Sequence, residues 1–295
     1  MVITPDISTL EYTMKNGIKY FELVAEPVNQ EILPGVFIKG WGYNGSIPGP
    51  TIQVYPGDYI SIRVINQLPE ATSIHWHGLN VPNVMDGVPE VEPSPRIEPG
   101  HYFDYHFHIN NPPGTHMYHS HVNVAKQDML GLLGGFVILD PHEINVNKDY
   151  LLLMQEWSLS GLQKGEKVKT GQYHLNPFAM EFNMFTINGK SFPSTTPMAI
   201  EYGDIVRLRL GAIQINHHPM HIHGHQFLIE KSDGNSIVNN RIFKNTILVA
   251  TGETWDVIFK ANNPGIWPFH CHIAHHVSNN FTDGTGGMFT TLVYK

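Results

Sequence analysis

The sequence predicts an all-β protein built from two Greek-key β-sandwiches in tandem. Charged residues make up only 15% of the 295 residues, and 27 Gly and 21 Pro supply many turns, a balance that favours strands and loops over helical bundles. Strand-length runs of apolar residues lie between Gly, Pro and Asn turns in both halves, as in antiparallel sandwiches. Landmarks of the first half also recur in order in the second half, which predicts a duplicated domain.

The first half alternates strand patterns with turn formers from its N-terminus onward. The expected strands include residues 19–24, 51–54, 60–64 and 136–139, with turns at Asn44-Gly45, Gly57-Asp58 and Pro113-Gly114. Helix is expected only as short turns, near residues 124–130 and after Ile273. These runs are too short and too often interrupted for long helices.

The second half repeats these landmarks. Gly203-Asp204 and the motif His221-Ile222-His223-Gly224 follow Gly57-Asp58 and His75-Trp76-His77-Gly78 at one common offset of 146 residues. Asn188-Gly189 answers Asn44-Gly45, and His270-Cys271-His272 answers His119-Ser120-His121 at an offset of 151. The polar stretch 140–149 separates the two copies, so we expect domains at residues 1–145 and 146–295.

Histidine pairs are the main chemical signal. The chain has 19 His and one Cys, and neutral His is the commonest side-chain metal ligand. Because side chains alternate along a strand, each His-x-His aims two imidazoles to the same face. In residues 268–276, Cys271 points away from its neighbours His270 and His272, so the thiol can bind one metal while the flanking imidazoles bind another. A Cys with two His and a weak axial Met is the ligand set of a blue-copper centre.

Four segments together resemble the copper signatures of the multicopper oxidases, with the likeness running from about residue 40 to the C-terminus. They are His75-Trp76-His77-Gly78, His119-Ser120-His121, the run from His218 to Gly224, and the run from His270 to His276. With only two cupredoxin-like domains, the chain is most similar to the two-domain, laccase-like branch. This resemblance implies copper of types 1, 2 and 3, four per chain.

The family pattern implies a role for each ligand. His75 and His221 resemble the ligands of type 2 copper, and His218, Cys271 and His276 those of type 1 copper. The ligands of the binuclear type 3 pair are then His77, His119, His121, His223, His270 and His272. Ser120 stands where the second half has Cys271, so the blue centre is expected in the second half alone, unlike in copper nitrite reductases.

The axial ligand of the blue centre has two candidates. The usual spacing of ten residues after the Cys leads to Phe281, whereas Met288 follows a ten-residue insertion. We favour Met288, because Gly286-Gly287-Met288 leads into the last strand much as Gly134-Gly135-Phe136 leads into its strand in the first half. The alternative is that Met288 packs in the core and is no ligand. A Phe at this position would raise the reduction potential.

Three further positions have expected roles. Asp86, in Met85-Asp86-Gly87, occupies a place where the family commonly has an acid near the cluster, so proton delivery is one interpretation and a turn-forming Asp is the other. Tyr118 is expected to be a buried structural residue. His106 and His108 are expected on the solvated face of a strand, and His276 is our candidate for electron entry near the surface.

The resemblance implies one-electron oxidation of a small-molecule donor, phenolic or aromatic, coupled to four-electron reduction of O2 to water. A metal-ion oxidase for Cu(I), Fe(II) or Mn(II) and a copper-binding protein without turnover are the alternatives. The resemblance also implies a homotrimer in which the first domain of one protomer faces the second domain of the next, with trinuclear clusters between subunits.

Charge and hydropathy limit the other partners. A net charge of −8 favours no nucleic-acid partner, and no apolar run reaches membrane-spanning length. The N-terminal residues 1–6 lack the basic and apolar regions of a signal peptide. We nevertheless expect a periplasmic or secreted protein.

Overall fold

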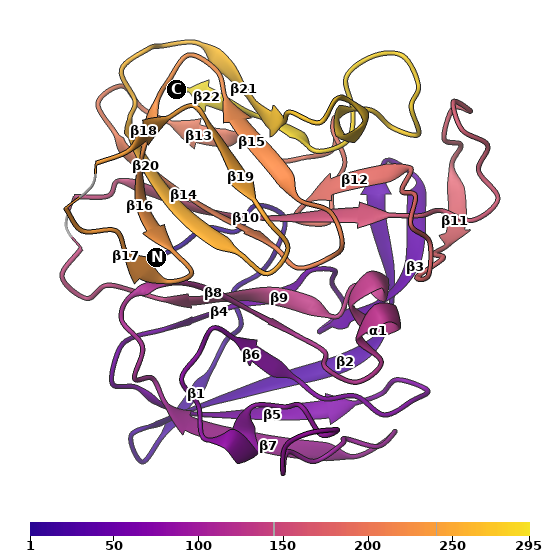
Figure 1. Cartoon of the computed structure of the whole chain (residues 1–295), viewed down its shortest axis with the longest axis vertical. Helices are drawn as coiled ribbons and strands as arrows, with labels where there is room; N and C mark the ends of the chain where they lie inside the picture. The colour runs from indigo at the N-terminus through magenta and orange to yellow at the C-terminus, as the bar shows by residue number, and fades with distance from the viewer. Residues whose placement is uncertain (144, 240) are drawn as a thin grey trace.

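The computed structural model describes residues 1–143, 145–239 and 241–295. Figure 1 shows two groups of strands, the first half of the chain in the lower part and the second half in the upper part. The all-β prediction is confirmed, with only short helices. Those helices are α1 (Val124–Leu130), where the sequence predicted one, η2 (Ala274–Val277) just after Ile273, and the unpredicted η1 (Asn83–Met85). In the described part of the chain, none of these helices has the length and apolar character needed to cross a bilayer.

Two sheets face each other in the first half. The larger has the order β11 (Gly171–His174), β3 (Val36–Tyr43), β2 (Ile18–Leu33), β5 (Tyr59–Asn66) and β7 (Tyr102–His108), with β1 (Thr13–Lys15) beside β2. The smaller has the order β4 (Gly49–Val54), β9 (Leu133–Ile138), β8 (Gly114–His119) and β6 (His75–His77). Trp76, Tyr105, Phe107 and Phe136 pack in the core between them.

The second half repeats this plan. One sheet has the order β12 (Met184–Ile187), β10 (Lys148–Trp157), β14 (Ile205–Ala212), β20 (Thr254–Lys260), β16 (Phe227–Ser232) and β17 (Asn235–Ser236), with β18 (Phe243–Lys244) beside β16. The other has the order β13 (Met198–Ile200), β22 (Phe289–Tyr294), β21 (Ile266–Cys271), β15 (His218–Ile222) and β19 (Thr246–Val249). The strands of the smaller sheets therefore correspond in pairs: β4 with β13, β9 with β22, β8 with β21 and β6 with β15.

The sheets are mostly antiparallel, as predicted, but each half also contains parallel strand pairs. β2 pairs in parallel with β5, and β4 with β9; the second half repeats both arrangements in β10 with β14 and β13 with β22. In each pair, a long stretch of chain connects the two strands. This stretch forms at least one strand in the opposite sheet before it re-enters the first one. Such crossovers bring the later strand back in the same direction as the earlier one.

β9, in a sheet of the first half, ends at Ile138, and β10, in a sheet of the second half, begins at Lys148. This connection overlaps the predicted linker at residues 140–149. Ile144 of that linker lies outside the described residues. β11 crosses this division, because Gly171–His174 pairs in parallel with β3. The second half thus contributes a strand to a sheet of the first half.

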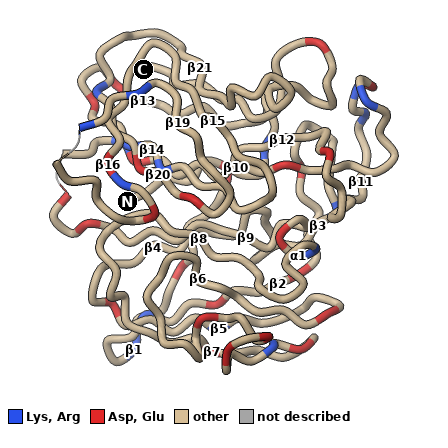
Figure 2. Tube along the Cα trace, in the orientation of Figure 1, with Lys and Arg blue, Asp and Glu red and all other residues tan. Residues whose placement is uncertain are grey.

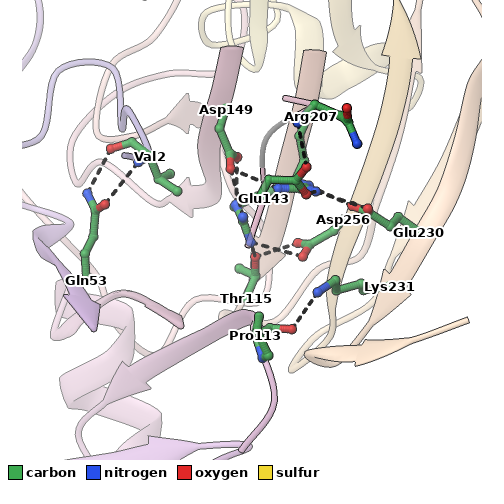
Figure 3. A network of polar contacts seen from close by, with 12 residues as sticks. Val2, Gln53, Pro113, Thr115, Glu143, Asp149, Arg207, Glu230, Lys231 and Asp256 are labelled. Carbon is green, nitrogen blue, oxygen red and sulfur yellow. Dashed lines mark hydrogen bonds and ion pairs between the residues drawn. The ribbon is translucent and has the colours of Figure 1, made fainter. Parts of the chain in front are cut away.

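Buried contacts hold the two halves together. Met117 and Leu133 pack against Leu151 and Leu153, and Figure 3 shows a polar network across the same boundary. In this network Arg209 bonds Thr115 at 2.9 Å and the buried Asp256 at 3.1 Å. Figure 2 shows that Lys and Arg positions are spread over both halves of the chain.

Candidate copper sites

Two His and the only Cys form a compact buried cluster in the second half. His218 begins β15, Cys271 ends β21 and His276 lies in η2, and one donor atom of each lies within 4.8 Å of the others. His218 Nδ1 is 3.2 Å from His276 Nδ1, which is 3.5 Å from Cys271 Sγ. Two imidazole nitrogens and one sulfur converging on one point suit a copper ion of the blue type.

Burial favours the neutral forms of Cys271 and His276 until a cation binds. Burial raises the pKa of the Cys271 thiol to about 12. Burial, together with the neighbouring His218, lowers the pKa of His276 to about 3. Because a metal binds thiolate and neutral imidazole, loading this site releases the thiol proton.

His276 is buried, whereas the sequence predicted a position near the surface. Only 6% of it is exposed, because the ring of Phe185 stacks on it with centroids 4.1 Å apart. The neighbouring His275 is exposed instead. The expectation that His276 lies near the surface is therefore wrong, since the η2 turn directs its ring inward.

The backbone of Met288 joins the two ligand segments. Its N–H donates to the carbonyl of His276 at 2.8 Å, and its carbonyl accepts from the N–H of Cys271 at 3.1 Å. The Met288 residue is fully buried. Phe281 instead packs against His275, with ring centroids 5.2 Å apart, and beneath Lys164.

The comparison of Met288 with Phe136 is wrong by four positions. Ser120 N–H donates to the carbonyl of Leu132 at 3.0 Å, as Cys271 N–H does to Met288. In the sheet, His119 pairs with Leu133, and His270 pairs with Phe289. The first-half counterpart of Met288 is therefore Leu132, because the insertion before Met288 changes the spacing but not the strand register.

Four His of the first half gather at the ends of β6 and β8. His75 and His119 are paired across the sheet, and ring centroids within this set are 5.4 to 6.1 Å apart. Trp76, between His75 and His77, is fully buried in the core. Strand alternation thus directs the two imidazoles to the opposite face, as predicted. Burial lowers the pKa of His77 to about 4, so this ring is neutral and able to bind metal near neutral pH.

Four His of the second half form an equivalent set. His221 and His270 are paired across β15 and β21, and the same five ring pairs recur with centroids 4.8 to 5.9 Å apart. An open cleft of about 790 Å³ borders His221 and His223. His272 is exposed, and His221, His223 and His270 are half-buried.

The two sets of four do not meet within the described part of the chain. The close ring contacts join members of the same set, and Figure 1 places β6 and β8 well away from β15 and β21. Each set therefore offers half of the predicted trinuclear ligands on a separate, partly open surface.

Two acidic side chains contact ring nitrogens of His in the first-half set. His75 Nδ1 lies 3.3 Å from Asp86 Oδ2 and 3.0 Å from the Asp86 carbonyl. His119 Nδ1 lies 3.1 Å from the buried Asp128, and burial raises the pKa of Asp128. Such contacts fix ring orientation and tautomer. Sequence motifs pointed to Asp86 but not to Asp128, whose signal was a charged residue directly before the short apolar run Met129 to Leu133.

A second missed carboxylate lies behind the Cys-containing cluster. Glu156 Oε2 is 3.2 Å from His218 Nε2, and both side chains are fully buried. The signal was a lone acid within the apolar strand pattern of residues 150–157. No spacing rule connects Glu156 to His218, because the two meet only through the pairing of distant strands.

The remaining expectations concern Tyr118 and the other His. Tyr118 is fully buried and donates to the carbonyl of Pro50 at 2.8 Å, which confirms its structural role. His106 and His108 are exposed on β7, also as predicted. His116 and His225 are buried outside the two sets.

The chain resembles known copper proteins over nearly its whole length. Two multicopper oxidase family models match residues 26–143 and 166–283. A crystal structure of a blue copper oxidase from Nitrosomonas europaea aligns with a TM-score of 0.81 and 33% identity, covering 93% of this chain and 85% of that chain.

Curated relatives are longer. A probable nitrite reductase-hydroxylamine oxidoreductase fusion protein of Kuenenia stuttgartiensis is 29% identical over 94% of this chain and 32% of its own length. Laccase-2 of Cryptococcus neoformans is 29% identical over 87% of this chain and 44% of its own length. The chain thus spans less than half the length of these two relatives. Its matched family models, with the solved structure aligned over most of both chains, show that it belongs to the multicopper oxidase family, whose members are copper-dependent oxidoreductases.

Proposed function

We propose that this protein is a laccase-like oxidase that removes single electrons from a small-molecule donor and reduces O2 to water. The observation that carries the proposal is the combination of a His-Cys-His cluster with two matching sets of four His. The cluster suits a type 1 copper and the two sets a trinuclear site, four copper ions per chain in total. When bound, copper supplies the redox chemistry.

The polypeptide connects the two kinds of site by a short covalent path. Cys271 belongs to the buried cluster, while its direct neighbours His270 and His272 belong to the set of four. Strand alternation separates these side chains to opposite faces. The backbone around Cys271 is thus our proposed electron route, and Met288 our proposed axial residue.

Asp86 is our proposed proton carrier for the site of O2 reduction. Its carboxylate touches His75, a proposed type 2 ligand. An Asp86→Asn variant keeps a group of the same shape but cannot exchange a proton in this way. We expect slower turnover with the copper content and visible spectrum retained. Unchanged turnover over the active pH range would assign Asp86 to the turn alone.

We propose further that the trinuclear sites form between subunits of a homotrimer. The separation of the two His sets and their partly open surfaces support this assembly, in which the first half of one protomer faces the second half of the next. Such a ring closes with one repeated interface. We also propose a periplasmic or secreted location, which fractionation of the native cells would test.

Mixing two inactive variants tests the assembly. His75→Ala damages the first-half set and His272→Ala the second-half set. In a mixed trimer with sites between subunits, one interface joins two undamaged sets, so oxidase activity returns after subunit exchange. If each trinuclear site formed within one chain instead, every site would carry one of the two substitutions, and mixing would restore no activity. Absence of restored activity despite verified exchange would contradict the proposed trimer.

Copper analysis combined with O2 uptake tests the proposed activity. We expect four copper per chain, a blue thiolate band and two of the four copper ions visible by paramagnetic resonance. O2 consumption with phenols, compared with Cu(I), Fe(II) and Mn(II), identifies the donor class. Fully loaded protein that consumes no O2 with any of these donors would contradict the enzyme assignment.

A further inference from the structure

Glu156 is a buried carboxylate with both oxygens engaged. Oε2 lies 3.2 Å from His218 Nε2, and Oε1 accepts a 2.7 Å hydrogen bond from the backbone N–H of Asn216. The backbone N–H of Glu156 donates to Gln214 Oε1 at 2.8 Å. Each carboxyl oxygen thus has one polar partner, and the third bond fixes the Glu156 backbone beside Gln214.

This contact determines which nitrogen of His218 can bind metal. An acceptor at Nε2 places the ring proton on that nitrogen and leaves the lone pair of Nδ1 free. Nδ1 is the atom that faces the other donors, 3.2 Å from His276 Nδ1. Glu156 therefore prepares His218 as a ligand through the far side of its ring.

The two imidazoles of the cluster have different surroundings. His218 contacts a carboxylate, whereas the ring of His276 stacks on the apolar face of Phe185. A carboxylate bonded to a ligating imidazole makes that imidazole a stronger donor. A negative charge in a buried setting also interacts strongly with nearby positive charge, because little water screens it.

We propose that Glu156 lowers the reduction potential of the copper held by His218, Cys271 and His276. This inference rests on the proposed type 1 site. Stronger donation and a nearby negative charge both stabilise Cu(II) relative to Cu(I). Glu156 is thus a positioning and potential-setting residue, and it limits how strongly the cluster can oxidise its donor.

Glu156→Gln tests the proposal, because Gln keeps the length of the side chain and removes its charge. The measurement is a redox titration of the blue absorption in copper-loaded protein. We expect the potential to rise by an amount equal to at least a tenfold change in the electron-exchange equilibrium, about 59 mV for a one-electron couple. A correctly folded blue variant whose potential is unchanged or lower would overturn the proposal.

Asp256→Asn is the matched control. Asp256 is also buried, at 1% exposure, and lies on β20 in the same sheet. It contacts Arg209 and Thr115 and no ligand of the cluster. We expect its removal to leave the potential unchanged. A rise equal to that of Glu156→Gln would indicate a general effect of lost buried charge and contradict a specific role.

Two measurements on the unaltered protein keep the proposal testable if Glu156→Gln does not fold. In pulsed paramagnetic resonance of the copper form, we expect the remote nitrogens of the two His ligands to differ in quadrupole coupling; equivalent nitrogens would overturn the inference. In ¹⁵N magnetic resonance of the metal-free protein, we expect the Nε2–H tautomer of His218. The opposite tautomer would overturn the inference without bearing on the proposed function, whereas failure of the cluster to bind copper would defeat the proposed function.

Discussion

The two halves of the molecule place their His pairs in the same register but surround them with different chemistry. His218 and Cys271 of the second half correspond to Thr72 and Ser120 of the first, at the offsets of 146 and 151 that relate the flanking motifs. In the first half, Thr72 donates to Gln127 at 2.8 Å, and Ser120 also bonds Gln127. Hydrogen bonds among neutral side chains therefore replace the metal donors there.

The halves also differ in what lies behind the paired His. His75 and His119 contact Asp86 and Asp128. His221, the counterpart of His75, contacts the carbonyl of Asn245 and the hydroxyl of Thr246 instead, and His270, the counterpart of His119, contacts the carbonyl of Cys271. The two copies of the scaffold thus have different chemical roles: the first half supplies carboxylates next to its paired His, and the second half supplies the thiolate.

Cys271→Ser makes the second half resemble the first and should have the largest effect. Without thiolate the blue band disappears, and oxidase activity falls to background because the cluster loses its soft ligand. Absorption spectra and O2 uptake measure both. Ser120→Cys is the control: it adds a thiol where Thr72 stands in place of His218 and Ala125 in place of His276, so we expect no new blue band. A blue band in Cys271→Ser would contradict the assignment.

Asp128→Asn removes the carboxylate that contacts His119; among the described residues, the Nδ1 partner of the counterpart His270 is the Cys271 carbonyl. The contact of Asp128 with His119 holds one proposed type 3 ligand, and loss of such contacts typically costs about 10 to 100-fold in metal affinity or activity. Copper content and O2 uptake should fall while the blue band stays. Asp104→Asn, in an exposed ion pair with Arg63, should leave both unchanged. Equal activity of Asp128→Asn and the unaltered protein would show that His119 needs no such support.

Met288→Leu introduces the side chain that the first half has at the equivalent position. The change conserves volume, so we expect a loss of less than about 1.5 kcal/mol in unfolding free energy. Loss of a thioether donor should raise the reduction potential while the protein remains blue. Redox titration checks the shift, with Phe281→Leu as the control that leaves it unchanged. The reverse pattern would make Phe281 the axial neighbour.

His116 gives the smallest expected effect, one on stability alone. Burial lowers its pKa to about 4 from the usual 6.5. The unfolded chain therefore binds the proton more readily than the folded one, and stability falls as pH drops from about 6.5 towards 4. The contribution is on the order of 3 kcal/mol. The second half has an aromatic residue, Trp267, at the equivalent position, which is why we choose Phe as the replacement. Because Phe binds no proton, His116→Phe should flatten the pH dependence of urea unfolding in the metal-free protein. An identical pH dependence would contradict this account.

Local sequence patterns alone determined the class of fold, the duplication, the short helix at residues 124–130 and the common facing of each His pair. These features depend on strand alternation and turn chemistry, which act over a few neighbouring residues. Local patterns also identified His218, Cys271 and His276 as the donors of the Cys-containing cluster, because each belongs to a short motif in the sequence.

Tertiary structure decided the rest. Glu156 reaches His218 across 62 positions of sequence, Leu132 takes the place opposite Ser120 that Met288 takes opposite Cys271, and β11 joins a sheet of the other half. The separation of the two His sets likewise follows from how the sheets pack. The physical reason is that strand pairing joins residues far apart in the chain, and neither their spacing nor their residue type specifies which strands become neighbours.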